Sequence, residues 1–140
     1  MELQTVFDTR RSVRSYDEQK TVSKEQIKEL VEAGIQAPSW KNSQTARYYC
    51  VLDDTLKEQF RKECLPEFNA NSSAGAALVV TTFVANRSGF DRSGTPDNEG
   101  ANGWGYYDLG LHNENFLLKA AELGLDTLVM GIRDADKIRS

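Results

Sequence analysis

Apolar positions recur at helical spacing near the start of the chain and predict two helices. The stretch 3–7 has the spacing of a short amphipathic helix. Ser23 and Gln26 have the spacing of a capping box, so we expect a second helix to begin after Ser23. The apolar positions between 27 and 35 share one face of that helix, and Pro38 marks its end.

Continuous or β-branched apolar runs predict the strands. Residues 47–52 read as a strand, and Asp53 or Asp54 then caps a helix. Residues 76–85 are nearly continuously apolar, which is typical of a strand buried on both faces. Residues 126–132 predict a further strand, so the sheet is expected to contain about three strands.

A long helix is predicted over residues 105–123, and it is apolar on more than one face. A sheet this small cannot cover all of that surface, so we expect a second copy of the chain to cover the rest. Residues 86–103 hold four glycines and one proline and predict a long functional loop. Asp134 reads as the cap of a short helix near the end of the sequence.

Composition narrows the class of protein. A length of 140 residues predicts a single domain over 1–140, and a net charge of −4 argues against nucleic-acid binding. No apolar run is long enough to span a bilayer, and no leader peptide is visible, so neither a membrane nor secretion is expected. Two isolated cysteines suggest a reducing, cytoplasmic setting.

The arginines of residues 8–16 stand out in an acidic chain. Arg10, Arg11 and Arg14 lie within five positions, with Ser12 between them. Guanidinium groups bind phosphate through two hydrogen bonds at once, and a serine hydroxyl can add another. The residues alone leave two interpretations open, a solvated basic run and a pocket for a small phosphate-bearing anion.

Side chains that could carry chemistry unaided are scarce. The sequence lacks phosphate-loop, dinucleotide-binding and serine-hydrolase motifs. Its single histidine, His112, follows Asp108 by one helical turn, and we interpret that pair as structural rather than catalytic or metal-binding. A protein without an evident acid, base or nucleophile is expected to rely on a cofactor, and the arginines indicate that this cofactor carries phosphate.

Two blocks of sequence resemble the nitroreductase family of flavoenzymes. The first has an R-x-S-x-R-x-Y stretch at Arg10, Ser12, Arg14 and Tyr16, followed by A-P-S-x-x-N-x-Q over residues 37–44. The second resembles the family's long helix and following strand. Its matching positions are Asp108, Gly110, Asn115, Leu118, Ala120, Gly124, Leu125, Thr127 and Gly131.

The resemblance implies an α+β nitroreductase-like fold: a central, mostly antiparallel sheet flanked by helices, with the long helix at a homodimer interface. It implies FMN bound between the subunits, held at its phosphate, ribityl chain and pyrimidine edge by the arginine segment. Loop residues of the partner would cover the flavin, and the backbone of the predicted third strand would approach its ring. The implied FMN-binding residues are Arg10, Arg11, Ser12, Arg14, Pro38, Ser39, Trp40, Asn42, Gln44, Met130, Gly131 and one of Asn69 and Asn71.

The implied activity is that of an oxidoreductase. NAD(P)H would reduce FMN in a ping-pong cycle, and an electron-poor small molecule such as a nitroaromatic or quinone would reoxidise it. The flavin carries the chemistry, Arg14 is the candidate for electrostatic stabilisation, and Phe90, Trp104 and Tyr106 are candidates for substrate stacking. Dehalogenation, flavin fragmentation and flavin storage remain as alternatives on the same fold, and a non-enzymatic anion-binding dimer remains as another.

The sequence departs from the family pattern at two places. Thr45 and Ala46 follow the motif Gln44, where relatives commonly have proline and a bulky residue. Relatives also continue for tens of residues after the second block, so we expect the C-terminal part of the fold to be missing from residues 1–140.

Overall fold

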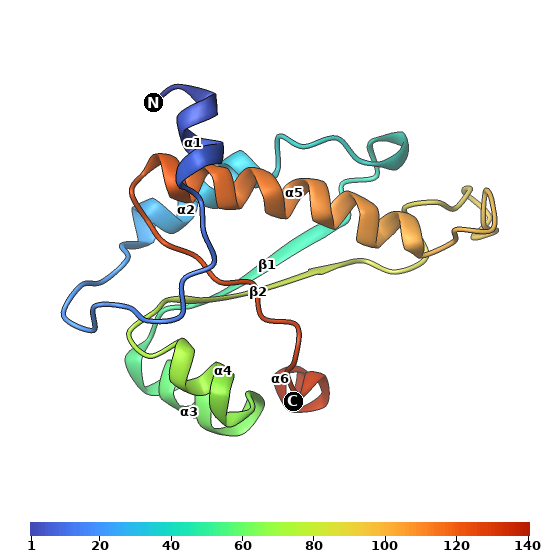
Figure 1. Cartoon of the computed structure of the whole chain (residues 1–140). Coiled ribbons are helices and arrows are strands. Elements are labelled where there is room, and N and C mark those ends of the chain that lie inside the picture. Colours follow the sequence, from blue (N-terminus) through green and yellow to red (C-terminus); the bar gives the residue numbers. More distant parts are fainter.

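The computed structural model describes all 140 residues as an α+β arrangement in which helices outnumber strands (Figure 1). α1 and α5 lie on one side of a two-stranded ribbon, and α3 and α6 lie on the other side. The elements are α1 (Leu3–Thr9), α2 (Lys24–Gly34), the short 3-10 turn η1 (Trp40–Asn42), β1 (Ala46–Val51), α3 (Asp54–Cys64), α4 (Glu67–Ser72), β2 (Leu78–Phe83), α5 (Gly103–Glu122) and α6 (Ala135–Arg139).

Local capping explains where α2 begins. The Ser23 hydroxyl accepts a hydrogen bond from the Gln26 backbone N–H at 3.1 Å, and the Gln26 side chain accepts one from the Ser23 N–H at 2.9 Å. These two bonds satisfy backbone donors that the helix itself leaves free. The predicted capping box is therefore confirmed. Asp53 and Asp134 cap α3 and α6 through their carboxylates, which accept from the backbone N–H groups of Leu56 and Lys137.

The sheet contains only β1 and β2. They pair antiparallel from Ala46 opposite Phe83 to Val51 opposite Leu78, and each strand keeps one unpaired edge. β2 is shorter than the predicted 76–85 strand, and only its Leu78 is buried. The prediction of a strand buried on both faces is wrong for this chain, because helices cover just one side of the ribbon closely.

The predicted strand over residues 126–132 is wrong as well. This segment makes one isolated parallel bridge, between Ser12 and Thr127, and then continues without a strand partner to α6. A strand needs a neighbour to satisfy its backbone groups, and β2 does not pair with the segment. A cavity of about 480 Å³, lined mainly by apolar residues of β2, α5 and 124–130, lies beside it.

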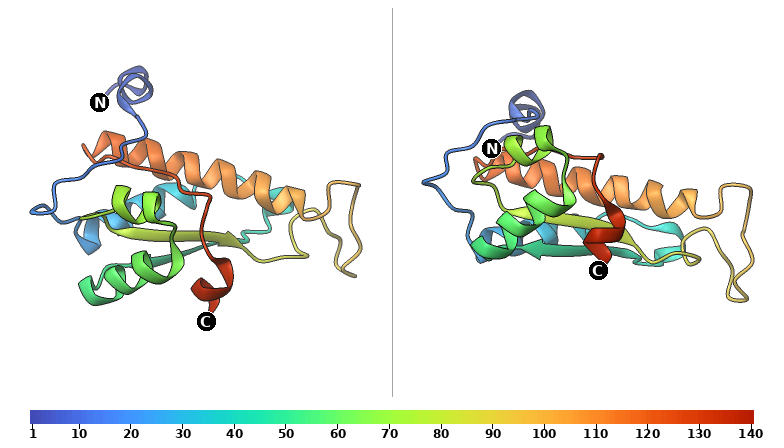
Figure 2. Two further views of the ribbon diagram at one scale, coloured as in Figure 1. Left: turned by 60° about the horizontal axis from the view of Figure 1, so that its bottom comes forward. Right: turned by 90° about the horizontal axis from the view of Figure 1, so that it is seen from below.

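α5 is the central helix, and α2 packs along it (Figure 2). Ile27 and Leu30 of α2 meet Ala120 of α5 in the core, and Phe116 and Val79 pack around this contact. Gly124 follows the end of α5 with φ +75°, a left-handed conformation that suits a glycine after a helix.

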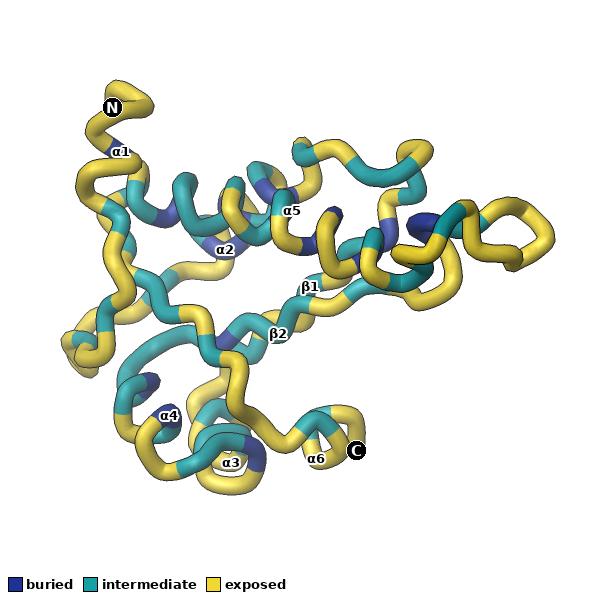
Figure 3. Tube along the Cα trace, turned by 45° about the vertical axis from the view of Figure 1, so that its right-hand side comes forward, coloured by how far each residue is buried: buried dark blue, intermediate teal, exposed yellow.

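This core is small for the length of the chain. Only 16 of 140 residues are buried, and most of these lie along α5, along α2 or where the loops meet them (Figure 3). Large apolar side chains such as Tyr106, Tyr107, Val129 and Ile132 are more than half exposed. Much apolar surface is thus left for contacts outside this chain. None of the helices has the length and apolar content needed to cross a membrane.

Candidate functional site

The arginine segment is held beside the end of α5. α1 ends where the Arg10 backbone N–H donates to the Val6 carbonyl at 3.0 Å. The chain then runs extended, and the Val13 N–H donates to the Thr127 carbonyl at 3.0 Å. The fold therefore brings the arginine segment alongside the 124–131 segment that sequence reasoning also selected.

The three guanidinium groups have no carboxylate partner. Arg11 Nη1 donates to the Arg10 carbonyl at 2.7 Å, and Arg14 Nη1 lies 3.5 Å from the Ser12 carbonyl. Arg10 is half-buried, whereas Arg11 and Arg14 are exposed. The ion pairs of the chain involve other cations. Unpaired positive charges gathered on one segment suit an anionic ligand.

A hollow of about 230 Å³ lies next to this cluster. Thr9, Arg10 and Arg11 line it from one side, and residues 124–127 line it from the other. Asp126 contributes the one carboxylate of this lining beside the arginines. The net charge of the lining remains positive, because two arginines face one carboxylate.

Tyr16 lies where the arginine segment meets the larger cavity. Burial raises the pKa of Tyr16, the charge of Asp126 raises it further, and the charge of Arg14 lowers it. The Tyr16 hydroxyl donates to the Val13 carbonyl at 2.8 Å, which fixes the ring against its own segment. Arg14, Tyr16 and Asp126 are therefore close enough to influence one another.

The second set of predicted residues lies in the loop after α2. Pro38 and Asn42 are exposed, Ser39 and Trp40 are half-buried, and the Gln44 side chain donates to Asn42 Oδ1 at 3.1 Å. The Trp40 backbone N–H donates to Asp108 Oδ2 at 3.0 Å, which fixes this loop near the start of α5.

The two sets lie at opposite ends of α5. The loop is fixed at Asp108, whereas the arginine hollow includes Gly124. Most of α5, from Asp108 to its end at Glu122, separates these positions, which corresponds to about 21 Å along the axis. One copy of the chain does not bring both sets to the same small ligand, and a site built from both sets needs two copies.

The family profile described as "Nitroreductase family" matches residues 8–140, nearly the whole chain. The chain belongs to the nitroreductase family. This match includes both sets of residues described above, and it agrees with the resemblance inferred from the two sequence blocks.

Relatives of known sequence and structure support this membership. YdgI of Bacillus subtilis (strain 168), named as an NAD(P)H nitroreductase, is 30% identical over 79 residues, which cover 56% of this chain and 37% of YdgI. A nitroreductase family protein from Clostridium novyi NT superposes with a TM-score of 0.78 at 22% identity, covering 99% of this chain and 74% of that one.

Two further structures have the same fold. An Exiguobacterium sibiricum 255-15 protein, described as a nitroreductase in complex with FMN, gives a TM-score of 0.81 at 19% identity, covering 99% of this chain and 78% of its own. The enone reductase CLA-ER gives 0.80 at 18% identity, with coverages of 97% and 78%. The chain thus spans less than half of the curated relative that it matches and about three quarters of these structures.

Within this nitroreductase-family fold, Asn69 ties two segments together. It is buried, and its side-chain amide donates to the Ile132 carbonyl at 2.9 Å. Asn71 is exposed. Met130 is half-buried in the lining of the larger cavity, and Gly131 is exposed with open space where a side chain would be. Met130 lines that cavity together with Tyr16, which belongs to the arginine segment.

The remaining candidates have structural contacts. His112 is buried, and its Nδ1 lies 2.6 Å from the Asp108 carbonyl within α5. Nowhere do three histidine, cysteine or acidic side chains gather as a metal site would require. Trp104 packs on Trp40, and Tyr106 packs edge-on against Phe83. Phe90 is half-buried and bridges to Pro96 in the 86–102 loop.

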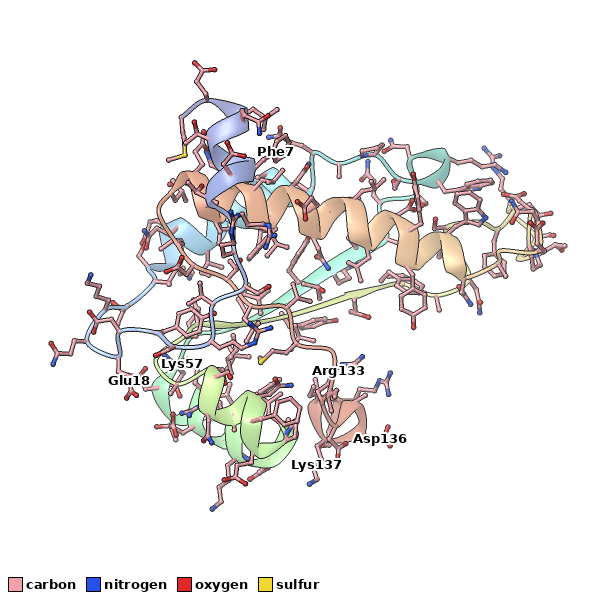
Figure 4. The ribbon with its side chains drawn as sticks, in the orientation of Figure 1. Phe7, Glu18, Lys57, Arg133, Asp136 and Lys137 are labelled. Carbon is pink, nitrogen blue, oxygen red and sulfur yellow. The ribbon has the colours of Figure 1, made fainter.

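Sequence reasoning did not select Arg133, a cationic residue beside the predicted ring-binding segment. Arg133 lines the larger cavity with Met130, and it lies between the strand ribbon and α6 (Figure 4). Its Nη1 donates to the Gly131 carbonyl at 3.0 Å, and it has no carboxylate partner. An arginine directly after an apolar segment was the only signal in the sequence, and it is too common to identify a site.

Proposed function

We propose that this chain forms part of an FMN-dependent oxidoreductase that takes electrons from NAD(P)H. The electron acceptor is an electron-poor small molecule, such as a nitroaromatic, a quinone or a conjugated enone. Family membership supports the general class, and the FMN complex and the enone reductase among the relatives support the cofactor and the kind of acceptor.

One observation carries the proposal: three guanidinium groups without carboxylate partners lie beside the 124–131 segment. Arg10, Arg11 and Arg14 fit the phosphate of FMN, which is doubly negative and binds well to guanidinium groups. The Ser12 hydroxyl is exposed on the same segment and is free to donate. The residues present therefore fit a phosphate-bearing cofactor.

FMN, when bound, supplies the hydride chemistry, and the side chains bind and shield it. We assign Arg10, Arg11 and Ser12 to its phosphate and ribityl chain, and Arg14 to negative charge that develops at the ring. Asn69 or Asn71 is the candidate for the pyrimidine edge, and the backbone at Met130 and Gly131 is the candidate for the ring. The loop with Pro38, Ser39, Trp40, Asn42 and Gln44 would come from a second copy and exclude water.

The decisive measurement is an FMN titration followed by reduction. We expect the purified protein to bind FMN and its visible absorbance to bleach when NADPH or NADH is added without oxygen. The variant with both Arg10→Ala and Arg14→Ala should bind FMN about 2–4 kcal/mol more weakly, which is roughly 30- to 900-fold in Kd.

Arg139→Ala is the matched control, because Arg139 is an exposed arginine on α6, on the other side of the ribbon from α1 (Figure 1). Its FMN affinity should equal that of the unchanged protein. If the variant with both Arg10→Ala and Arg14→Ala bound FMN as tightly as the unchanged protein, the assignment of these arginines to FMN would be wrong. A protein that takes up no FMN at all would contradict the proposed function and favour an anion-binding dimer.

A further inference from the structure

The turn at residues 39–44 has an unusual backbone. Lys41, Asn42 and Gln44 have φ values of 49°, 52° and 52°, in the left-handed region. Residues other than glycine adopt this region rarely, and they keep it only where surrounding contacts hold them there. Contacts around the turn must therefore hold these residues in this conformation.

Some of these contacts lie within the turn. The Gln44 N–H donates to Ser39 Oγ at 3.0 Å, and the Asn42 N–H donates to the Ser39 carbonyl at 2.9 Å. The Ser43 N–H donates to the Trp40 carbonyl at 2.9 Å. These bonds close the turn on itself but leave its position relative to the rest of the molecule undetermined.

Trp40 fixes that position through three contacts with other elements. Its backbone N–H donates to the carboxylate of Asp108 on α5 at 3.0 Å, and its indole N–H donates to Asp97 Oδ2 at 2.8 Å. Its ring packs on Trp104, with 4.5 Å between the ring centroids and 40° between the planes. Trp40 is therefore held at its backbone, its ring edge and its ring face.

Asp97 belongs to the 86–102 loop and is well placed to act as an anchor. Its own N–H donates to the Gly89 carbonyl at 2.8 Å, and its side chain is 19% exposed. The same Oδ2 that binds Trp40 lies 2.8 Å from Lys41 Nζ. One carboxylate thus binds two successive residues of the turn, and one of these is in the left-handed region.

We propose that Asp97 is a positioning residue that acts through Trp40 and presets the 39–44 turn before the cofactor binds. The 86–102 loop would in this way control the FMN affinity of the proposed two-chain site without touching FMN. A preset loop loses less conformational freedom on binding than a mobile one, and this difference appears as affinity. This inference rests on the proposed function.

The two tryptophans of the chain provide a test that needs no cofactor. The sequence contains only Trp40 and Trp104, so the near-ultraviolet tryptophan circular dichroism reports this pair directly. Asp97→Ala should lose most of that signal while its far-ultraviolet spectrum is unchanged. Asp97→Asn keeps an oxygen that can accept from the indole N–H, so this variant should retain most of the near-ultraviolet tryptophan signal. Glu99→Ala is the control, because it removes a charge from the same loop at an exposed residue without a hydrogen bond.

FMN titrations of the same variants test the effect on binding. Asp97→Ala should bind FMN about tenfold more weakly, whereas Glu99→Ala should stay within about twofold of the unchanged protein. A wild-type tryptophan signal in Asp97→Ala would overturn the positioning role. If Asp97→Ala loses the tryptophan signal but binds FMN as tightly as the unchanged protein, the 86–102 loop does not control FMN affinity. If the unchanged protein binds no FMN, the proposed function itself fails and the inference fails with it.

Discussion

Gly34, the last residue of α2, occupies a position with no room for a side chain. A Cβ there would lie 2.7 Å from the Tyr48 hydroxyl and 3.3 Å from the His112 carbonyl oxygen. The Tyr48 ring stacks on Phe116, with 5.8 Å between the centroids, and its hydroxyl has no protein partner. Burial raises the pKa of Tyr48 to about 12. The tyrosine therefore stays neutral and determines how closely α2 approaches β1.

This contact predicts a pair of coupled substitutions. Gly34→Ala should lower the free energy of unfolding by about 1–3 kcal/mol, because the new methyl group overlaps the Tyr48 hydroxyl. Tyr48→Phe removes that hydroxyl and should change stability little. Denaturant unfolding of both single variants and the double variant tests the coupling. If Tyr48→Phe does not relieve the Gly34→Ala defect, the overlap is not its cause.

For single residues, the sequence alone shows which residue types could form a site better than it shows which groups they contact. The arginines could be selected from their spacing in the sequence, whereas the carbonyl groups that accept from Arg11 and Arg14 could not. One of Asn69 and Asn71 is the predicted flavin contact, and the sequence gives no sign that the Asn69 amide donates to the carbonyl of Ile132, 63 positions away. The role of Asp97 could not be predicted, because an aspartate in a polar loop has no distinguishing neighbours in the sequence.

Among the elements, the 86–102 loop should make stability depend on pH. The pKa of Asp97 is lowered mainly by its hydrogen bond from Lys41 and then by that from Trp40. The pKa of Asp91 is lowered mainly by the Ser93 hydroxyl and then by the Thr95 backbone N–H. A carboxyl whose folded-state pKa lies below its unfolded value stabilises the protein above the unfolded pKa, and this stability is lost as pH falls through the folded one.

We therefore expect the melting temperature to fall as the pH drops below about 4. The variant with both Asp91→Asn and Asp97→Asn should show a smaller drop than the unchanged protein, because neither position then titrates. Thermal unfolding followed by circular dichroism at a series of pH values measures this. If the melting temperatures of the two proteins fall equally as the pH drops, Asp91 and Asp97 do not cause the pH dependence.

Elements with local signals were predictable, and those that depend on distant partners were not. The capping box of α2 and the aspartate caps of α3 and α6 were correct because they involve neighbouring residues. α4 was missed because its helix is short and is held by Arg61, which donates to the Ala70 carbonyl at 2.9 Å and 2.7 Å. Residues 126–132 have strand composition but lack a strand to pair with.

For the whole molecule, the small core and the two separated sets of site residues both favour a homodimer built around α5. Gly110 is exposed on α5, and a Cβ there would meet no atom within 4 Å in the same chain. Gly110→Arg should therefore leave the chain folded but block close approach of a second copy. We expect about twice the 15.7 kDa chain mass for the unchanged protein by light scattering, and one chain mass for this variant.

Glu25→Arg, also a bulky cation on an exposed helix position, is the control and should leave the mass unchanged. If the Gly110→Arg protein is still a dimer, the exposed face of α5 around Gly110 does not form the dimer interface. A monomeric unchanged protein would contradict the dimer and the two-chain site together.

The unpaired edge of β2 affects how the protein must be handled. Its outward backbone groups, together with exposed Val129, which lines the same cavity as β2, form a template to which another extended polypeptide can add. Nothing such as a proline or a bulge within β2 blocks this addition. Strand-to-strand aggregation is thus the first failure to expect on concentrating or warming the protein, and a stock solution is best kept dilute and cold.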